Sequence, residues 1–342
     1  MLKSIAIEDY LDAAARQNPS LAPVGGTIRA LTEAACEISA MIGLGALAGE
    51  MSETVGVNAD GDAQRALDLR SQDALTAALR RAPVAAIASE ELEDWALLDP
   101  DAPLAVAFDP VDGSSSIDAN LTIGTIFSIL PAKGVNNPFV GRSSAQLAAG
   151  FFLYGPQTTF VLTLGAGVDV FTLDRRDATW RLTRARAMIP SGTPEFAINV
   201  SNYRHWEEPV RVYIDDCLNG SEGPREKNFN MRWIGALVAE ASRILVRGGV
   251  YLYPGDQRPD YREGRLRLIY EAHPIAFIVE QAGGKASTGR ARVLDVAASS
   301  LHQRVPLIFG SAEKVALLER LHAAPTGRAE HSPLFGRRGL FR

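Results

Sequence analysis

The sequence predicts a layered α/β fold in which helices pack on mixed β-sheets. Short apolar, β-rich runs alternate with amphipathic helical patterns over most of the 342 residues. Between residues 150 and 183, four strand-like runs follow one another with glycine and proline between them, a pattern typical of antiparallel hairpins. Because each of these elements has an apolar face to bury against another, the mixture requires stacked α and β layers.

The composition is that of a globular chain, with 46% hydrophobic residues, 22% charged residues and a formal charge of −5. This balance gives no reason to expect a nucleic acid partner. Two cysteines, Cys36 and Cys217, are too few for a disulfide framework. The longest uncharged apolar run near the N-terminus, residues 38–49, is too short to span a bilayer, and a signal-peptide core is missing. We therefore expect a cytoplasmic protein without a membrane partner.

The N-terminal part predicts a helix followed by a loop. Thr27 is expected to cap a helix whose apolar positions recur every three or four residues over 28–42. Residues 49–61 have no sustained period and contain three glycines, so we expect a mobile loop. This loop leads into Asp62 and Asp68.

The next segment predicts a helix, a strand and an acidic pair. The helix is expected over 71–81, before Pro83, and the strand over 84–88. The strand delivers Glu90 and Glu91. These two carboxylates fit either a functional pair or an ordinary acidic start of a helix, since the N-terminal end of a helix favours negative charge.

The centre of the chain, residues 104–130, joins two predicted strands, 104–108 and 125–130, through an acidic turn. Asp109 and Asp112 follow the first strand, Pro110 fixes the backbone between them, and Gly113 opens a run of hydroxyl residues. Carboxylates followed by small residues with free backbone N–H groups suit hard cations and a phosphate. The plain alternative is an Asp/Gly/Ser turn between two strands.

The second half predicts further alternation, and Pro190, Gly192 and Pro194 mark the boundary between the halves. We expect domains over 1–190 and 191–324, followed by a disordered tail over 325–342. The expected elements are strands at 196–200, 250–253, 265–270 and 305–309, and helices at 231–247, from Pro274 to Gly283, and at 312–323.

Seven acidic residues lie at the ends of these predicted elements or in loops: Asp62, Asp68, Glu90, Glu91, Asp109, Asp112 and Glu271. Converging carboxylates repel one another unless cations neutralise them. Oxygen ligands without His or Cys favour Mg²⁺ or Mn²⁺ over zinc, and two or three such ions can promote hydrolysis of a phosphate ester. Sequence spacing allows this convergence without proving it.

Several motifs, in order from about residue 27 to 320, resemble class I fructose-1,6-bisphosphatases of the bacterial type. They are GDAQRALD, ASEE, FDPVDGSSSIDANLTIGTIFSI, GGVYLYP, GRLRLIYEAHPIAF and EQAGGKASTG. The resemblance implies a sugar-phosphatase fold, an αβαβα sandwich, and a homotetramer. It also implies Mg²⁺-dependent hydrolysis of fructose 1,6-bisphosphate to fructose 6-phosphate and phosphate, in gluconeogenesis or the Calvin cycle.

The same resemblance implies a role for each matching residue. The implied metal ligands, for two or three ions per subunit, are Glu90, Glu91, Asp109, Asp112, Glu271 and the Val111 carbonyl. Asp68 and Glu91 would take the proton of the attacking water, while Asp62 would steady a closed loop. The implied substrate contacts are Gly113, Ser114 and Ser115 for the 1-phosphate, Asn199, Tyr253 and Arg232 of a neighbouring subunit for the 6-phosphate, and Arg265 in place of a substrate-contacting Lys.

The chain departs from the family pattern at several positions. Trp233 replaces a phosphate-binding Tyr, Arg265 replaces a Lys, and Ser116 replaces an Asn, so sugar binding is expected to differ more than the chemistry. Pro103 and Leu104 occupy the place of the Lys-Tyr pair that binds AMP in animal members. We therefore expect weak or absent AMP inhibition. The Cys-bearing insertion of redox-regulated plastid forms is missing, which argues against thiol control.

Two other classes of function remain open at this stage. The first is a related sugar phosphatase, either a sedoheptulose-1,7-bisphosphatase, alone or as a second activity, or an inositol-monophosphatase-like enzyme. The inositol family usually has Thr where this chain has Ser114, and it lacks the GGVYLYP and GRLRLIYE blocks. The second is a non-catalytic phosphosugar sensor, which would be expected to have lost metal carboxylates.

Overall fold

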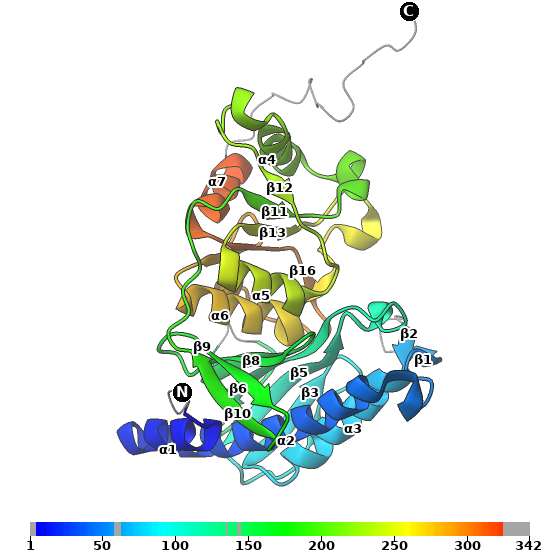
Figure 1. The fold of residues 1–342 in the computed structure, drawn as a ribbon, viewed down its shortest axis with the longest axis vertical. Helices are drawn as coiled ribbons and strands as arrows, with labels where there is room; N and C mark the ends of the chain where they lie inside the picture. Colours follow the sequence, from blue (N-terminus) through cyan, green and yellow to red (C-terminus); the bar gives the residue numbers. More distant parts are fainter. Residues whose placement is uncertain (1–4, 58–62, 135, 142–144, 324–342) are drawn as a thin grey trace, which may run out of the picture.

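The computed structural model describes residues 5–57, 63–134, 136–141 and 145–323. Figure 1 shows helices and sheets stacked in alternating layers along the long axis of the molecule. Three clusters of buried side chains lie between these layers. The arrangement is an α-β-α-β-α sandwich, which confirms the expected layered fold.

The larger sheet contains eight strands in the order β10-β9-β8-β7-β6-β5-β3-β4. β3 and β5 pair in parallel, and the other neighbours are antiparallel. The hairpins predicted over 150–183 are confirmed as β7 to β10. The strand bounds are β3 Val84–Ser89, β4 Ala96–Leu97, β5 Leu104–Asp112, β6 Ile123–Pro131, β7 Ala148–Tyr154, β8 Thr158–Thr163, β9 Asp169–Asp174 and β10 Thr179–Arg184.

Three helices cover one face of this sheet: α1 Ile7–Gln17, α2 Ala22–Leu44 and α3 Ala66–Leu79. Their apolar faces pack against Val106, Phe108 and other residues of the sheet. By length and hydropathy the helical stretch Pro19–Ala48 resembles a membrane span, and it is longer than the short uncharged run within it. Of its most apolar window, 39% is buried in the protein, so burial alone does not distinguish a core helix from a membrane span.

The other face of the large sheet packs on α5 Leu237–Arg247 and α6 His273–Gln281, which also contact the smaller sheet. That sheet has the order β12-β11-β13-β17-β15. Its far face is covered by α4 Glu208–Leu218 and α7 Ala312–Ala323. The bounds of its strands are β11 Glu195–Ala197, β12 Asn230–Met231, β13 Val250–Tyr253, β15 Lys285–Ser287 and β17 Leu307–Gly310.

Two helices near the N-terminus begin earlier than predicted. α2 starts at Ala22 with a proline in its first turn, so Thr27 is an interior residue whose hydroxyl donates to the Pro23 carbonyl (3.1 Å). α3 starts at Ala66, ahead of Ser71, because the Asp68 carboxylate in its first turn accepts a hydrogen bond from the backbone N–H of Arg65 (2.7 Å). The loop expected over 49–61 contains β1 Thr54–Val57, which pairs with β2 Ala63–Arg65.

Elements of the second half are shorter than predicted. The helix expected over 231–247 begins at Leu237, since Met231 belongs to β12 and pairs beside β11. The strand expected over 196–200 is confined to β11, and Asn199 caps a 3₁₀ turn that follows it. The strand expected over 265–270 is confined to β14 Leu266–Arg267, which pairs with β16 Arg304–Val305.

Candidate functional site

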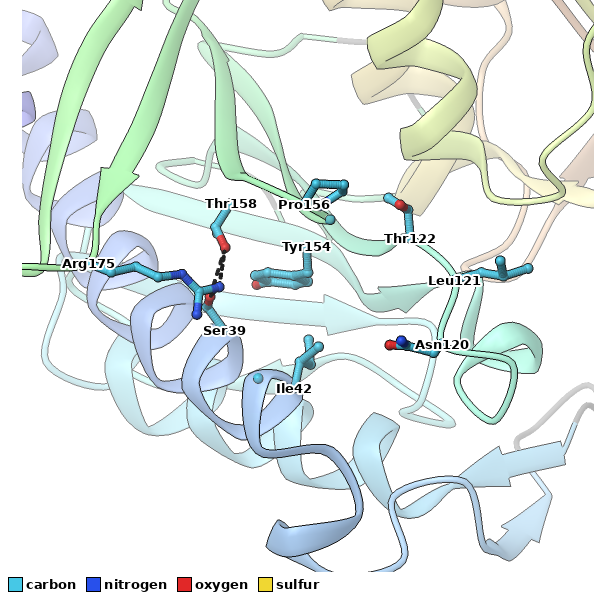
Figure 2. Close-up of a pocket in the computed structure, with 11 residues that line it drawn as sticks. Ser39, Ile42, Asn120, Leu121, Thr122, Tyr154, Pro156, Thr158 and Arg175 are labelled. Atoms are coloured by element: carbon cyan, nitrogen blue, oxygen red, sulfur yellow. Dashed lines mark hydrogen bonds between the residues drawn. The ribbon is translucent and has the colours of Figure 1, made fainter.

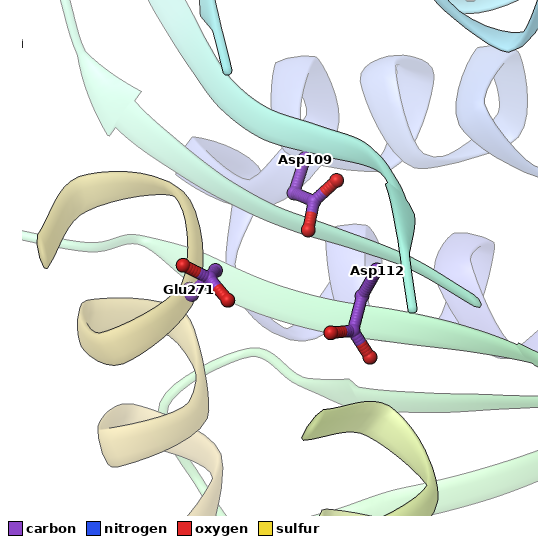
Figure 3. A group of neighbouring side chains, drawn as sticks. All are labelled: Asp109, Asp112 and Glu271. Carbon is purple, nitrogen blue, oxygen red and sulfur yellow. The ribbon is translucent and has the colours of Figure 1, made fainter. Parts of the chain in front are cut away.

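Three buried carboxylates converge between the layers. Asp109, Asp112 and Glu271 each offer an oxygen within 4.8 Å of the others. Figure 3 shows the two aspartates, at the end of one strand, facing the glutamate from a helical segment. All three residues are buried, with 3% of Asp109, 8% of Asp112 and 7% of Glu271 exposed. Residues more than 150 positions apart therefore meet in one acidic centre.

An irregularity in β5 brings the two aspartates together. In a regular strand, side chains three residues apart point to opposite faces of the sheet. The register between β5 and β6 shifts between Asp109 and Asp112, at Pro110. The Pro110 carbonyl accepts a hydrogen bond from the Thr125 hydroxyl (2.8 Å), and Val111 N–H donates to Asp109 Oδ1 (2.9 Å). Because of this register shift, the Asp109 and Asp112 carboxylates point to the same side of the sheet.

Glu271 reaches the centre from a π-helical turn, Leu268–Ala272, that runs directly into α6. Its Oε2 accepts a hydrogen bond from the backbone N–H of Arg267 (2.5 Å). A π turn is a frequent device at functional sites because it re-aims one side chain. Sequence periodicity predicted a strand here, and the turn is what directs Glu271 toward the aspartates.

These carboxylates line a cavity of about 280 Å³, which we call the carboxylate cavity. It opens between the large sheet and the β13–β14 region. Its lining combines five acidic residues with three arginines and small residues: Glu90, Glu91, Asp109, Val111, Asp112, Gly113, Ser114, Ser115, Gly235, Tyr253, Arg265, Leu266, Arg267, Glu271 and Arg304. Glu90 and Glu91 follow β3 in a turn, so they do not begin a helix.

The acidic centre has strongly perturbed electrostatics. Burial is the main cause that raises the pKa of Asp109 and of Glu271 well above the ordinary range, and neighbouring carboxylates add to it. Burial also raises the pKa of Asp112 to about 6, although backbone N–H groups at the start of α5 oppose this rise. One of these groups, Val238 N–H, donates to Asp112 Oδ2 (2.8 Å).

The residues of the centre fit a divalent cation. Their donor atoms are carboxylate oxygens, the ligands that Mg²⁺ and Mn²⁺ prefer. Several buried carboxylates in mutual repulsion are unfavourable without positive charge, and a cation relieves that repulsion. The arginines in the cavity supply part of this charge, since Arg267 Nη2 lies 3.7 Å from Glu90 Oε1.

The residues after Asp112 form a small-residue cradle beside the acids. Gly113 has a φ of +83°, and a Cβ added there would lie 2.8 Å from the Ala236 Cβ. This position therefore requires glycine. Ser114 and Ser115 follow in a 3₁₀ turn, and all three residues line the carboxylate cavity. Small residues beside the acids leave room for a ligand at this position.

The opposite end of the cavity is formed by an arginine stacked among aromatic rings. The Arg265 guanidinium lies 4.3 Å from the Tyr261 ring centroid and 5.8 Å from that of Tyr253. Arg258 also stacks on Tyr261 (4.3 Å) and is paired with Asp256. These contacts hold Arg265 in a defined orientation, which a lysine at this position would not share.

The remaining predicted site residues are not part of the group formed by Asp109, Asp112 and Glu271. Asp68 is buried at the start of α3, and burial together with Glu90 raises its pKa to about 6, while the Ser114 hydroxyl lowers it. The described cavity lining includes neither Asn199, whose Oδ1 accepts from Ser201, nor Arg232, which lies 3.6 Å from Glu195. Asp62 lies outside the described residues.

Sequence reasoning missed three polar residues at this site. Arg267 is 2% exposed beside Glu90, and Arg304 lines the cavity from β16. Gln64 Nε2 donates to Glu91 Oε2 (2.6 Å), which ties the β1–β2 hairpin to the acidic pair. The GRLRLIYE block contains Arg267 next to Glu271, but nothing in the local pattern distinguishes a buried arginine from an exposed one.

Trp233 is part of an aromatic cluster next to the cavity. Its ring is parallel to that of Tyr251, with centroids 5.8 Å apart, and Tyr253 meets it edge-on. Tyr251 in turn packs against Phe309 of β17. The indole therefore supports the position of Tyr253 by packing.

Comparisons with known proteins agree with this geometry. The model of the fructose-1,6-bisphosphatase N-terminal domain matches residues 10–185, and that of the C-terminal domain matches residues 189–323. Class 1 fructose-1,6-bisphosphatases of Rhodopseudomonas palustris are similar: one from strain HaA2 is 59% identical over 93% of both chains, and one from strain BisA53 is 55% identical over the full length of both.

The solved fructose-1,6-bisphosphatase of Leishmania major in its holo form superposes with a TM-score of 0.86 at 32% identity, covering 94% of this chain and 99% of that one. Two matched domain models, relatives aligned from end to end and a shared fold lead to one conclusion: the chain belongs to the class 1 fructose-1,6-bisphosphatase family.

Proposed function

We propose that the carboxylate cavity is where this enzyme, a fructose-1,6-bisphosphatase, hydrolyses the 1-phosphate of fructose 1,6-bisphosphate. The observation that carries the proposal is the convergence of Asp109, Asp112 and Glu271 within 4.8 Å beside the Gly113 cradle. The products are fructose 6-phosphate and phosphate. The names of the similar proteins favour the fructose substrate over sedoheptulose bisphosphate or an inositol phosphate.

We propose Mg²⁺ as the metal, with Mn²⁺ as a substitute, at two or three ions per subunit. The ligands would be the five cavity carboxylates and the Val111 carbonyl. When bound, divalent ions neutralise phosphoryl oxygens and lower the pKa of water. Glu91 and Asp68 would accept the proton of the attacking water. The raised pKa of Asp68, about 6, brings this carboxylate close to the range where it can both take and release a proton.

Substrate contacts would divide between the two ends of the cavity. The backbone N–H groups of the Gly113 cradle and the hydroxyls of Ser114 and Ser115 would hold the 1-phosphate next to the acids. Tyr253 and Arg265 would bind the sugar and its distal phosphate. Asn199 and Arg232 lie outside the described lining, so their proposed contact with the 6-phosphate requires a neighbouring subunit or a change of shape on binding.

Further proposals concern the organisation of the protein. We propose a homotetramer in the cytoplasm, with two halves that meet near residue 190. Residues from the β3–β5 region and residues from the β13–β14 region both line the cavity, which supports a site built between the halves. Light scattering on the purified chain tests the tetramer, for which the expected mass is four times 36.8 kDa.

The activity is tested by measuring phosphate release from three substrates, with Mg²⁺ and with a chelator. We expect rapid, Mg²⁺-dependent release from fructose 1,6-bisphosphate, slower release from sedoheptulose 1,7-bisphosphate and almost none from inositol phosphate. A higher kcat/KM for sedoheptulose bisphosphate would overturn the substrate assignment. Undiminished activity in the chelator would overturn the metal assignment. Absence of any turnover would instead favour a phosphosugar sensor.

A further inference from the structure

A second cavity, of about 440 Å³, lies away from the carboxylate cavity, and we call it the Arg175 pocket. It is lined by the last turns of α2, the β7–β8 turn, the loop before β6, and Arg175 from the β9–β10 turn. Figure 2 shows Arg175 on one side of this pocket, with Asn120, Leu121 and Thr122 on the other. Among the eleven lining residues drawn there, Arg175 is the single one with a formal charge.

The guanidinium of Arg175 is held by neutral partners. Its Nη2 donates to the Ser39 hydroxyl (3.2 Å) and to the Thr158 hydroxyl (3.0 Å), and both side chains are 2% exposed. The two hydroxyls are also bonded to each other (2.9 Å). Such partners fix the orientation of the guanidinium without neutralising its charge. Within the described part of the chain, no carboxylate is recorded at ion-pair distance from Arg175.

The neighbouring arginine provides an internal contrast. Arg176 is 89% exposed along its side chain and pairs with Asp174 (2.7 Å), as surface arginines commonly do. Arg175 is also an exposed residue, but it lines the pocket and lies against Gly43 in α2, where a Cβ would be 3.4 Å from its Nη1. The last turn of a helix favours a nearby cation, which helps to place the guanidinium, although the helix end carries only about half a charge. A net positive charge therefore remains in the pocket.

The other walls suit a small organic anion. Asn120 and Thr122 place an amide and a hydroxyl across from Arg175, while Ile42, Leu121 and Pro156 supply apolar surface. The volume falls in the range of small-molecule sites. The guanidinium can bind a phosphate group through its N–H donors, and the amide and hydroxyl on the opposite wall suit polar groups elsewhere on the same metabolite.

We propose that the Arg175 pocket binds the phosphate group of a small metabolite, with the Arg175 guanidinium as its charged partner and Asn120 and Thr122 on the opposite wall. This site is separate from the carboxylate cavity and does not depend on the reaction proposed there. A carboxylate ligand would use the same guanidinium with fewer donors, and the experiment below distinguishes the two.

Equilibrium dialysis with inorganic phosphate, on the full-length chain in Mg²⁺, tests the proposal. We expect Arg175→Gln to lose one bound phosphate per subunit relative to the unmodified protein. Arg176→Gln is the matched control, because it removes the same charge one residue away, and it should lose none. Equal binding by the Arg175→Gln variant and the unmodified protein would overturn the proposal. So would equal losses in both variants, since these would indicate general charge attraction.

Two further measurements keep the test decisive. If Arg175→Gln lowers the melting temperature by loosening the hairpin, Thr122→Val examines the opposite wall without touching that contact. We expect Thr122→Val to weaken binding of glycerol 3-phosphate at the pocket at least threefold, and unchanged binding would contradict the proposed site. Glycerol 3-phosphate should displace phosphate from the pocket, whereas acetate should not. Displacement by acetate alone would replace the phosphate assignment with a carboxylate.

Discussion

The two ends of the carboxylate cavity are built on different principles. At one end, acids from β3, β5 and the π turn are buried and repel one another, and their pKa values rise as a result. At the other end, Arg265 is partly exposed and stacked among tyrosines that hold it by packing. Repulsion among the buried carboxylates destabilises the acidic end, and a bound cation would relieve that repulsion. At the arginine end, stacking on the tyrosines already holds the guanidinium without a ligand. We infer that the acidic end serves the chemistry and the arginine end serves recognition.

The largest effect is expected at the acidic end. Asp109→Asn should lower kcat about a thousandfold or more, because it removes a charge from the centre of the carboxylate group while preserving its shape. Steady-state kinetics in Mg²⁺, with circular dichroism to verify folding, measure this effect. Asp118→Asn, an exposed carboxylate on the following loop, is the control and should retain normal turnover. Near-normal turnover in Asp109→Asn would remove the distinction between the two ends.

The second prediction concerns pH and the metal-free protein. The folded-state pKa of Asp112, about 6, exceeds its ordinary value of 3.8, so the native state holds this proton more tightly than the unfolded state does. Stability without metal should therefore fall as pH rises from about 4 through about 6, by about 3 kcal/mol from this residue alone. Urea unfolding at pH 5 and pH 8 in a chelator measures the later part of this fall, about half of it.

Mg²⁺ should close much of that gap, because it binds the deprotonated acids in the native state. In the chelator, Asp109→Asn should be at least as stable as the unmodified protein at pH 8, since it removes one repelling charge. Metal-free stability that is constant or rises between pH 5 and pH 8 would argue against an electrostatically unfavourable acidic end.

The third prediction distinguishes two effects of a Cβ at Gly113: strain from the positive φ, and steric contact with Ala236. Gly113→Ala adds a Cβ 2.8 Å from the Ala236 Cβ at a position with a φ of +83°, and should lower kcat/KM by about tenfold to a hundredfold. Gly141→Ala is the control, because Gly141 has a φ of +82° with no atom within 4 Å of the added Cβ. Comparable activity losses in both variants would mean that the close approach to α5 is unimportant.

The smallest effect is expected at the arginine end. Arg265→Met should raise KM for fructose 1,6-bisphosphate about tenfold with kcat within a few-fold of normal, because it removes a binding contact and no reacting group. Arg265→Lys keeps the charge without the stacked fork, and we expect a smaller increase in KM. If kcat of Arg265→Met falls as strongly as that of Asp109→Asn, the assignment of chemistry to the acidic end and recognition to the arginine end is wrong.

Local sequence patterns predicted elements well where burial and periodicity agree. The four strands β7 to β10, α6 with Pro274 in its first turn, and α7 all appear where expected. Errors occur where pairing or capping overrides the local pattern. Met231 joins β12 rather than α5, and the hydrogen bond from Arg65 N–H to the Asp68 carboxylate starts α3 before Ser71. Neither competing interaction is visible in a single window of sequence.

For the site, the sequence by itself determined the chemistry of its parts: which acids are present, that glycine and serines follow Asp112, and which family carries these motifs in this order. Only the tertiary structure decided that these parts meet. The register shift in β5 turns Asp109 and Asp112 to one side, and the π turn aims Glu271 at them. It also decided that Arg267 is buried against Glu90, and that Arg175 lines a cavity while Arg176 pairs with Asp174. The reason is that residue type is local, whereas side-chain direction and burial depend on strand pairing and on layers brought together from distant parts of the chain.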